Sequence, residues 1–332
     1  MKRIICIFAL MSAIASFQAR GMGVLSSENV KSGDACDEIN LVFIGNSITA
    51  GALLGNASEQ APPIVCRALM EKKSGIKTNV FNGGHSGITT FGFMPGRRAY
   101  RKVVDAAKGF HANNGGTVYF SIMLGTNDSA CTTTEGAPVS PDTYGKNMRT
   151  IIDSLILAVP SCRILLNYPI WYSPTTHNGA RYLQEGLDRL QTYYPVIEAI
   201  AAEYDQVYLG NRKAWNAFEN KKKLFTVEEG RSGTFYLHPN AKGAHRLAEI
   251  WAKSLLDIIK DDMNNDTNKG HPCPARVTGM LLFYTLLLYH FIFYTEPFVE
   301  RAFYLGADGR GDVFLNFLVD VKYGYAIVHD AQ

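Results

Sequence analysis

Four short segments of this chain carry the residue types that ester hydrolysis requires. They are residues 45–49 (GNSIT), 82–87 (NGGHSG), 125–128 (GTND) and 237–240 (LHPN). Hydrolysis at neutral pH needs an activated hydroxyl, a base that takes its proton, and hydrogen-bond donors where the carbonyl oxygen becomes negative. Ser47 can supply the hydroxyl, His238 the base and Asn127 a donor. The order and spacing of the four segments favour acyl transfer more strongly than any one of them alone.

Each segment by itself also has an ordinary structural explanation. The Gly-Asn-Ser run is compatible with an Asx turn that caps a helix, and the glycines of residues 82–87 with a tight turn. A single histidine is more often structural than catalytic. His85, His177 and His245 are rivals of His238, but His245 falls within an expected helix and His177 in a loop beside aromatic residues.

The elements that must position these residues follow an alternating pattern. Apolar runs rich in β-branched and aromatic residues alternate with longer amphipathic stretches, as in βαβ units. We expect strands at 40–45, 77–82, 117–124, 163–168 and 206–209, and helices at 62–73, 97–108, 141–158, 179–204 and 240–260. Right-handed crossovers then give an α/β fold, a three-layer α/β/α sandwich around a five-stranded parallel sheet. The four segments converge on the carboxyl edge of that sheet, where ligands bind in open α/β folds.

Residues 1–20 are typical of a signal peptide. Two basic residues precede an almost uncharged run at 4–17, and Ala13 and Ala15 are spaced for cleavage. A buried N-terminal helix is the alternative. The signal predicts export to the periplasm or the extracellular space.

The C-terminal part of the chain differs in composition from the rest. Residues 261–276 are polar and rich in turn formers, which predicts a linker after a domain at 38–260. Residues 277–294 are almost wholly apolar and reach the lower length limit for a membrane span. Possible membrane contact, an extra helix packed on the domain and a truncated unrelated unit all fit the segment 277–332. Its role stays open.

Charge and cysteine content exclude several function classes. The formal net charge is +3, and no basic run exceeds the triplet at 221–223, so binding to nucleic acid is not expected. Five scattered cysteines remain after the signal, without a C-x-x-C pair, which argues against a zinc site or a disulfide scaffold. We therefore expect neither a metal nor a cofactor.

Together, the segments resemble the four sequence blocks of the SGNH hydrolase superfamily, also called GDSL esterases. Residues 43–49 match block one, with Asn46 in place of the commoner aspartate, and residues 82–90, 125–128 and 238–240 match the others. The resemblance covers about residues 38–260. It implies a flavodoxin-like fold, Ser47 as nucleophile, His238 as base, and an oxyanion hole formed by Ser47, Gly87 and Asn127.

One position departs from the family pattern. The family usually places an aspartate three residues before the histidine, and here that position is Phe235. Either a backbone carbonyl of residues 231–235 orients His238 in a Ser–His dyad, or Glu228 or Glu229 replaces the aspartate. We favour the carbonyl, because neither glutamate has the family spacing.

The sequence predicts the class of substrate but not the individual compound. Residues 120–129 and 168–174 resemble exported bacterial esterases of the acetyl-carbohydrate branch, including sialate O-acetylesterases. Asn46, Trp171, Tyr172 and His177 are the expected substrate contacts, with packing of the aromatic rings into the core as the alternative. The expected partner is thus a small-molecule or glycan ester. A lysophospholipase or thioesterase is the alternative enzyme, and a non-catalytic carbohydrate-binding protein, supported by Phe235, is the alternative class.

Overall fold

The computed structural model describes residues 38–269, 301–307, 313–322 and 325–330. A five-stranded sheet has the order β2-β1-β3-β4-β5, and all its neighbouring strands are parallel. The strands are β1 (Glu38–Gly45), β2 (Lys77–Gly84), β3 (Val118–Met123), β4 (Arg163–Leu166) and β5 (Val207–Leu209). Every residue of β3 is buried, as expected for a central strand covered on both faces. The α/β prediction with five parallel strands is confirmed.

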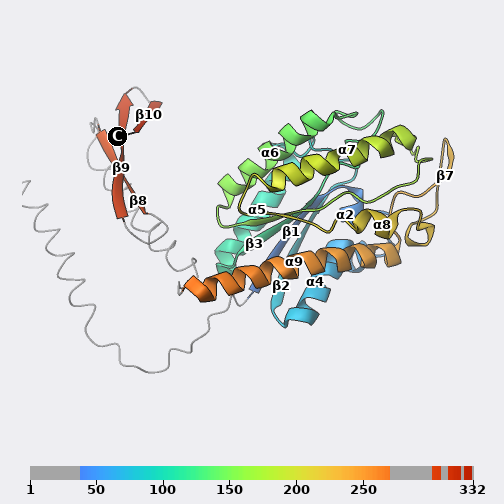
Figure 1. Cartoon of the computed structure of the whole chain (residues 1–332), viewed down its shortest axis with the longest axis horizontal. Coiled ribbons are helices and arrows are strands. Elements are labelled where there is room, and N and C mark those ends of the chain that lie inside the picture. Colours follow the sequence, from blue (N-terminus) through green and yellow to red (C-terminus); the bar gives the residue numbers. More distant parts are fainter. Residues whose placement is uncertain (1–37, 270–300, 308–312, 323–324, 331–332) are drawn as a thin grey trace, which may run out of the picture. The chain divides into compact units, whose positions relative to one another are not determined.

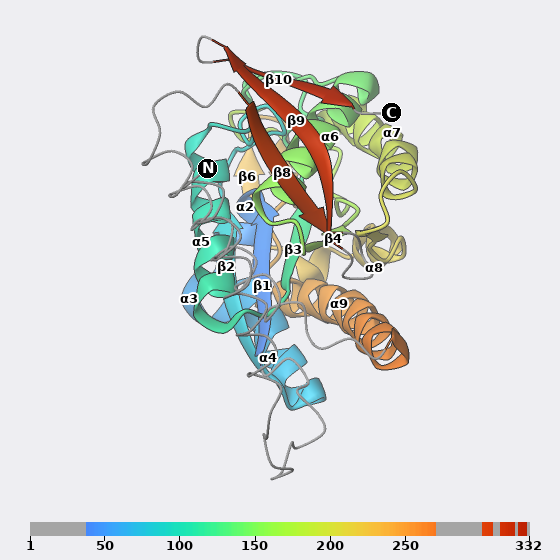
Figure 2. The same cartoon turned by 90° about the vertical axis from the view of Figure 1, so that its left-hand side faces the viewer.

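Helices cover both faces of this sheet. The main helices are α4 (Pro62–Ser74), α5 (Arg98–Asn114), α6 (Pro141–Ala158), α7 (Leu183–Ala201) and α9 (Ala241–Lys269). The helices α4 and α9 pack together on one face, and α6 and α7 pack together on the other (Figure 1). Figure 2 shows β2, β1, β3 and β4 side by side between them. The α6 helix begins as the sequence predicts, because the Ser140 hydroxyl accepts a hydrogen bond from the Thr143 amide and Pro141 occupies the first turn.

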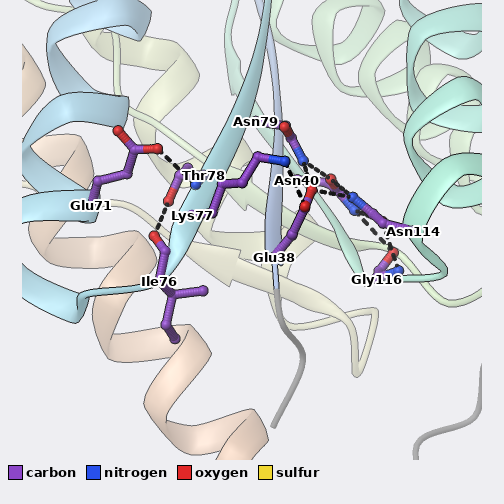
Figure 3. A network of polar contacts seen from close by, with 9 residues as sticks. All are labelled: Glu38, Asn40, Glu71, Ile76, Lys77, Thr78, Asn79, Asn114 and Gly116. Carbon is purple, nitrogen blue, oxygen red and sulfur yellow. Dashed lines mark hydrogen bonds and ion pairs between the residues drawn. The ribbon is translucent and has the colours of Figure 1, made fainter. Parts of the chain in front are cut away.

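A polar network closes the amino end of the sheet, away from the candidate site (Figure 3). The buried Asn40 side chain of β1 accepts hydrogen bonds from Asn79 and Asn114, both at 2.9 Å. Glu38 accepts from the same two amides and from Lys77. These donors, Lys77 first, lower the pKa of Glu38 to about 2. The network joins β1 to β2 and to the end of α5, which fixes the register of the strands that lead to the site.

Several expected helix boundaries differ from the observed ones, including the end of α5, which is Asn114 instead of residue 108. The helix α7 starts at Leu183 instead of residue 179, because Arg181 forms isolated bridges with Thr132 and His177. The helix α9 continues to Lys269, so the linker expected at residues 261–276 begins within a helix. Asp262 on this extension pairs with Arg163 at 3.0 Å and holds the helix end against the sheet.

Short elements complete the described chain. They are α2 (Ser47–Ala50), α3 (Ala57–Gln60), α8 (Ala214–Phe218), the 3-10 helix η1 (Lys222–Leu224), and a hairpin of β6 (Glu228–Gly230) and β7 (Gly233–Phe235). A separate antiparallel sheet is formed by β8 (Arg301–Ala307), β9 (Val313–Lys322) and β10 (Tyr325–Asp330), where the sequence predicted no elements. No helix within the described ranges is long and apolar enough to cross a membrane. The expected signal peptide and the apolar segment 277–294 lie outside those ranges.

Candidate active site

Ser47 lies at the carboxyl end of β1, as the first residue of α2. The Asn46 side chain caps this short helix by accepting a hydrogen bond from the Ile48 amide at 2.9 Å. A Cβ at Gly84 would overlap the backbone of Ala50, so only glycine at the end of β2 lets the helix pack this closely. The turn therefore holds the Ser47 hydroxyl at the edge of the sheet.

The structure brings His238 to Ser47 across 191 residues of sequence. His238 Nε2 lies 2.8 Å from Ser47 Oγ. The histidine precedes α9, and the adjoining backbone pairs with the segment before β6, since the Thr226 amide donates to the His238 carbonyl at 2.9 Å. Figure 1 shows α2, α8 and β7 at the same end of the sheet.

Glu228 occupies the place of the missing aspartate, so the preference for a backbone carbonyl is wrong. Both carboxylate oxygens lie 3.0 Å from His238 Nδ1, and one of them also accepts from the His238 amide at 3.1 Å. A carboxylate only accepts hydrogen bonds, so Nδ1 carries the proton and Nε2 is left to accept from Ser47. Ser47, His238 and Glu228 thus have the connectivity of a catalytic triad.

The hairpin explains how a glutamate ten residues before the histidine reaches it. Glu228 pairs with Phe235 across β6 and β7, and Phe225 bridges Pro239 on the same antiparallel arrangement. This antiparallel pairing of residues 225–230 with residues 233–239 brings Glu228 to His238, which lies between the end of β7 and Pro239. The Gly-Arg-Ser-Gly turn at residues 230–233 is the sequence signal that could have indicated this hairpin.

Gly87 and Asn127, two of the predicted oxyanion donors, lie on the second and third of the four segments, at this edge of the sheet. Gly87 has φ of 77° in a turn closed by the hydrogen bond from the Ile88 amide to the His85 carbonyl. Asn127 follows β3, and its side-chain NH₂ donates to the Ile88 carbonyl at 2.8 Å. The described contacts use one of the two Asn127 amide hydrogens, so the other can donate to a bound oxyanion.

Asp128 joins the second segment to the third. Its carboxylate accepts hydrogen bonds from the amide and the hydroxyl of Thr90. Burial raises the pKa of Asp128 to about 6, and the Thr90 donors offset part of that increase. The second oxygen is buried and has no hydrogen-bond partner among the described residues. Asp128 fixes the Gly87 turn relative to Asn127.

Three of the four expected substrate contacts are buried, which does not favour that role for them. Trp171 and Tyr172 are 3% and 0% exposed, and they pack on Phe225 and Tyr182. Both rings fill the core beneath the rim, so they cannot stack on a sugar. Asn46 is buried as the cap of α2. Only His177 is partly exposed, with Nδ1 at 3.1 Å from the Ser232 hydroxyl of the hairpin turn.

No group of three metal-ligating side chains occurs within the described part of the chain. Cys66 and Cys162, both buried, have pKa values raised by burial and lie on α4 and before β4 rather than among the site residues.

Comparisons with known proteins give a family match and several similar structures. The model of the GDSL-like lipase/acylhydrolase family matches residues 43–246, well over half of the chain. No match is found among curated proteins. A lipase/acylhydrolase from Enterococcus faecalis is 16% identical, with a TM-score of 0.44 and coverage of 65% of this chain and 94% of that one. A family 3 carbohydrate esterase from Clostridium thermocellum is 15% identical (TM-score 0.43, coverage 68% and 98%), and a carbohydrate acetylesterase from Sinorhizobium meliloti is 16% identical (TM-score 0.46, coverage 66% and 99%).

Proposed function

The chain belongs to the GDSL-like lipase/acylhydrolase family, and we propose that Ser47, His238 and Glu228 hydrolyse carboxylic esters through an acyl-enzyme. The observation that carries the assignment of residues is the continuous chain of hydrogen bonds from Ser47 Oγ to His238 Nε2, and from His238 Nδ1 to Glu228. A serine esterase needs such a base, oriented by a third group, to activate the hydroxyl of its serine.

The reaction follows from this geometry. Ser47 Oγ attacks the ester carbonyl carbon while its proton passes to His238 Nε2, and the carbonyl oxygen becomes an oxyanion. The backbone N–H groups of Ser47 and Gly87 and the Asn127 amide donate to that oxygen. The C–O bond to the alcohol then breaks, and the imidazolium returns the proton to the leaving oxygen. Water deacylates Ser47 by the same steps, with His238 again as base.

We infer a short acyl group, acetyl above all, on a carbohydrate as the substrate. Support comes from the polar character of the rim: His85 and Ser86 are exposed beside Gly87, and His177 stands beside the hairpin that carries Glu228. Hydroxyl-rich alcohols are recognised by such polar side chains. The sequence likeness to sialate O-acetylesterases points to the same class, with His177 as a proposed substrate contact.

A second candidate is an acylhydrolase for longer or apolar esters, such as a lysophospholipase or thioesterase. Three exposed apolar side chains stand on loops next to site residues: Leu53 (58%), Phe91 (43%) and Val227 (64%). Exposed apolar groups gathered near a site often mark a place for an apolar ligand. These three side chains are the observation that supports the second candidate, whereas the polar residues of the rim support an acetylated carbohydrate.

One experiment separates these functions. Rates of hydrolysis of p-nitrophenyl acetate, octanoate and palmitate, and of acetate release from O-acetylated sialic acid and acetylated xylan, are measured for the wild type and Ser47→Ala. We expect Ser47-dependent release of acetate and a loss of at least about 10⁴ in kcat for the variant. A preference for palmitate would support the second candidate. Wild-type activity in Ser47→Ala would refute the serine mechanism.

We further propose that the protein is exported and that residues 277–294 contact a membrane. The basic, then apolar, N-terminus and the length of the apolar segment support these proposals. Sequencing the N-terminus of the protein recovered from culture medium or periplasm tests the first. Flotation of the full chain with vesicles tests the second, with truncation at residue 269 as control.

A further inference from the structure

A buried tyrosine outside the four sequence blocks contacts the candidate oxyanion donor. The Tyr182 hydroxyl donates a hydrogen bond of 2.7 Å to Asn127 Oδ1, and the contact is buried on both sides. Tyr182 lies directly before α7, and no role follows for it from the triad. We propose that Tyr182 is a positioning residue that sets the orientation of the Asn127 amide for oxyanion binding, an inference that rests on the proposed esterase function.

Both ends of the Asn127 amide have a hydrogen-bond partner. A tyrosine hydroxyl that donates requires an oxygen opposite it, and the Ile88 carbonyl at 2.8 Å requires a nitrogen. These two contacts together permit only one orientation of the Asn127 side chain. In that orientation one N–H is held by Ile88 and the second is available to the oxyanion. The reversed amide would place oxygen against oxygen at Ile88 and present an acceptor to the oxyanion.

The backbone around Tyr182 and its ring are both held by contacts. The Cys131 amide donates to the Arg181 carbonyl at 2.6 Å, and the Tyr182 amide donates to the Thr176 carbonyl at 3.2 Å. The ring packs edge-on against Tyr172, with centroids 5.4 Å apart. Backbone and ring are thus both fixed, which is what preorganisation of an oxyanion donor requires.

The environment of the Tyr182 hydroxyl keeps it protonated. Burial raises the pKa of Tyr182, and the nearby Asp128 and Glu228 carboxylates raise it further. The hydroxyl therefore stays protonated at every pH at which an ester hydrolase of this type works. It can serve as a permanent donor to Asn127.

The test uses the full chain and p-nitrophenyl acetate. Tyr182→Phe keeps the packed ring and removes only the donor, so kcat should fall about tenfold with KM changed less than about twofold. The inhibition constant of phenylboronic acid, whose tetrahedral adduct on Ser47 places an oxygen at the oxyanion position, should rise by about the same factor. In an Asn127→Ala background, Tyr182→Phe should have no further effect, because the amide it orients is gone.

Tyr193→Phe is the matched control. Tyr193 is also buried, on α7 itself, and donates to a backbone carbonyl, that of Val139, at 2.6 Å. Both variants should lower the melting temperature, but only Tyr182→Phe should lower kcat. Equal kcat for Tyr182→Phe and Tyr193→Phe, or a full tenfold loss that persists in the Asn127→Ala background, would overturn the inference. Failure of the esterase proposal itself is recognised separately, by activity that survives Ser47→Ala.

Discussion

Replacement of Glu228 by glutamine tests the part of the site that the sequence pattern did not contain. The carboxylate lies 3.0 Å from His238 Nδ1, and the two side chains are only 12% and 10% exposed. When His238 takes the Ser47 proton, a positive charge forms beside this carboxylate. At an effective dielectric constant of about 20, two charges at that separation attract by about 5.5 kcal/mol. This energy corresponds to about four decades in rate.

Glutamine keeps an oxygen for Nδ1 and for the His238 amide but loses the charge. We therefore expect Glu228→Gln to lower kcat for p-nitrophenyl acetate by about 10³ to 10⁴, with KM nearly unchanged. The matched control is Glu229→Gln. Glu229 is the next residue of β6, so it points to the opposite face of the hairpin, and it accepts a hydrogen bond from the Thr234 hydroxyl at 2.9 Å. Its replacement should leave kcat within about twofold of the wild type, as for surface substitutions.

Kinetics of the two variants decide between the triad and the dyad. A Glu228→Gln enzyme that keeps more than a tenth of the wild-type kcat would refute the triad, because a backbone carbonyl would then suffice to orient His238. A large loss in Glu229→Gln with none in Glu228→Gln would show that the hairpin pairs differently in solution. Circular dichroism and the melting temperature of both variants should match the wild type.

Two further substitutions test buried residues: Trp171, which was expected to contact substrate, and Asp128, which contacts Thr90. Trp171→Ala should lower the free energy of unfolding by about 3–5 kcal/mol in urea, because the ring is buried against Phe225. A raised KM with unchanged stability would instead show that Trp171 contacts the substrate. Burial raises the pKa of Asp128 to about 6 in the folded state. Between about pH 4 and pH 6 the folded state therefore keeps a proton on Asp128 that the unfolded state has released. As the pH rises through this range, Asp128 makes the free energy of unfolding fall. Asp128→Asn should remove that fall, which unfolding curves at several pH values between 4 and 7 would detect; an unchanged pH profile would contradict the burial of a titrating Asp128.

Local pattern in the sequence was sufficient for the sheet and for most of the site. Five apolar runs with helical stretches between them specify a parallel α/β fold, because strand and helix periodicities are local properties and crossovers have a fixed hand. Ser47, Asn127 and His238 were predicted from their segments, since each follows a strand or precedes the last helix, and Gly87 was predicted from the resemblance to the SGNH hydrolases. Convergence of strand ends on one edge then places them together.

Contacts between distant segments decided the rest. Sequence spacing could not pair Glu228 with His238, because that pairing depends on the register of a hairpin closed by residues 230–233. Exposure of Trp171 and Tyr172 was equally undetermined, since an aromatic side chain in a loop packs inward or outward according to what lies beneath it, here Phe225 and Tyr182. Asp262, on the extension of α9, likewise pairs with Arg163, which is 99 residues away in the sequence. The sequence by itself thus determined which segments meet at the edge of the sheet. Only the tertiary structure decided which side chains face one another there, because strand register and packing across the fold set the side-chain partners.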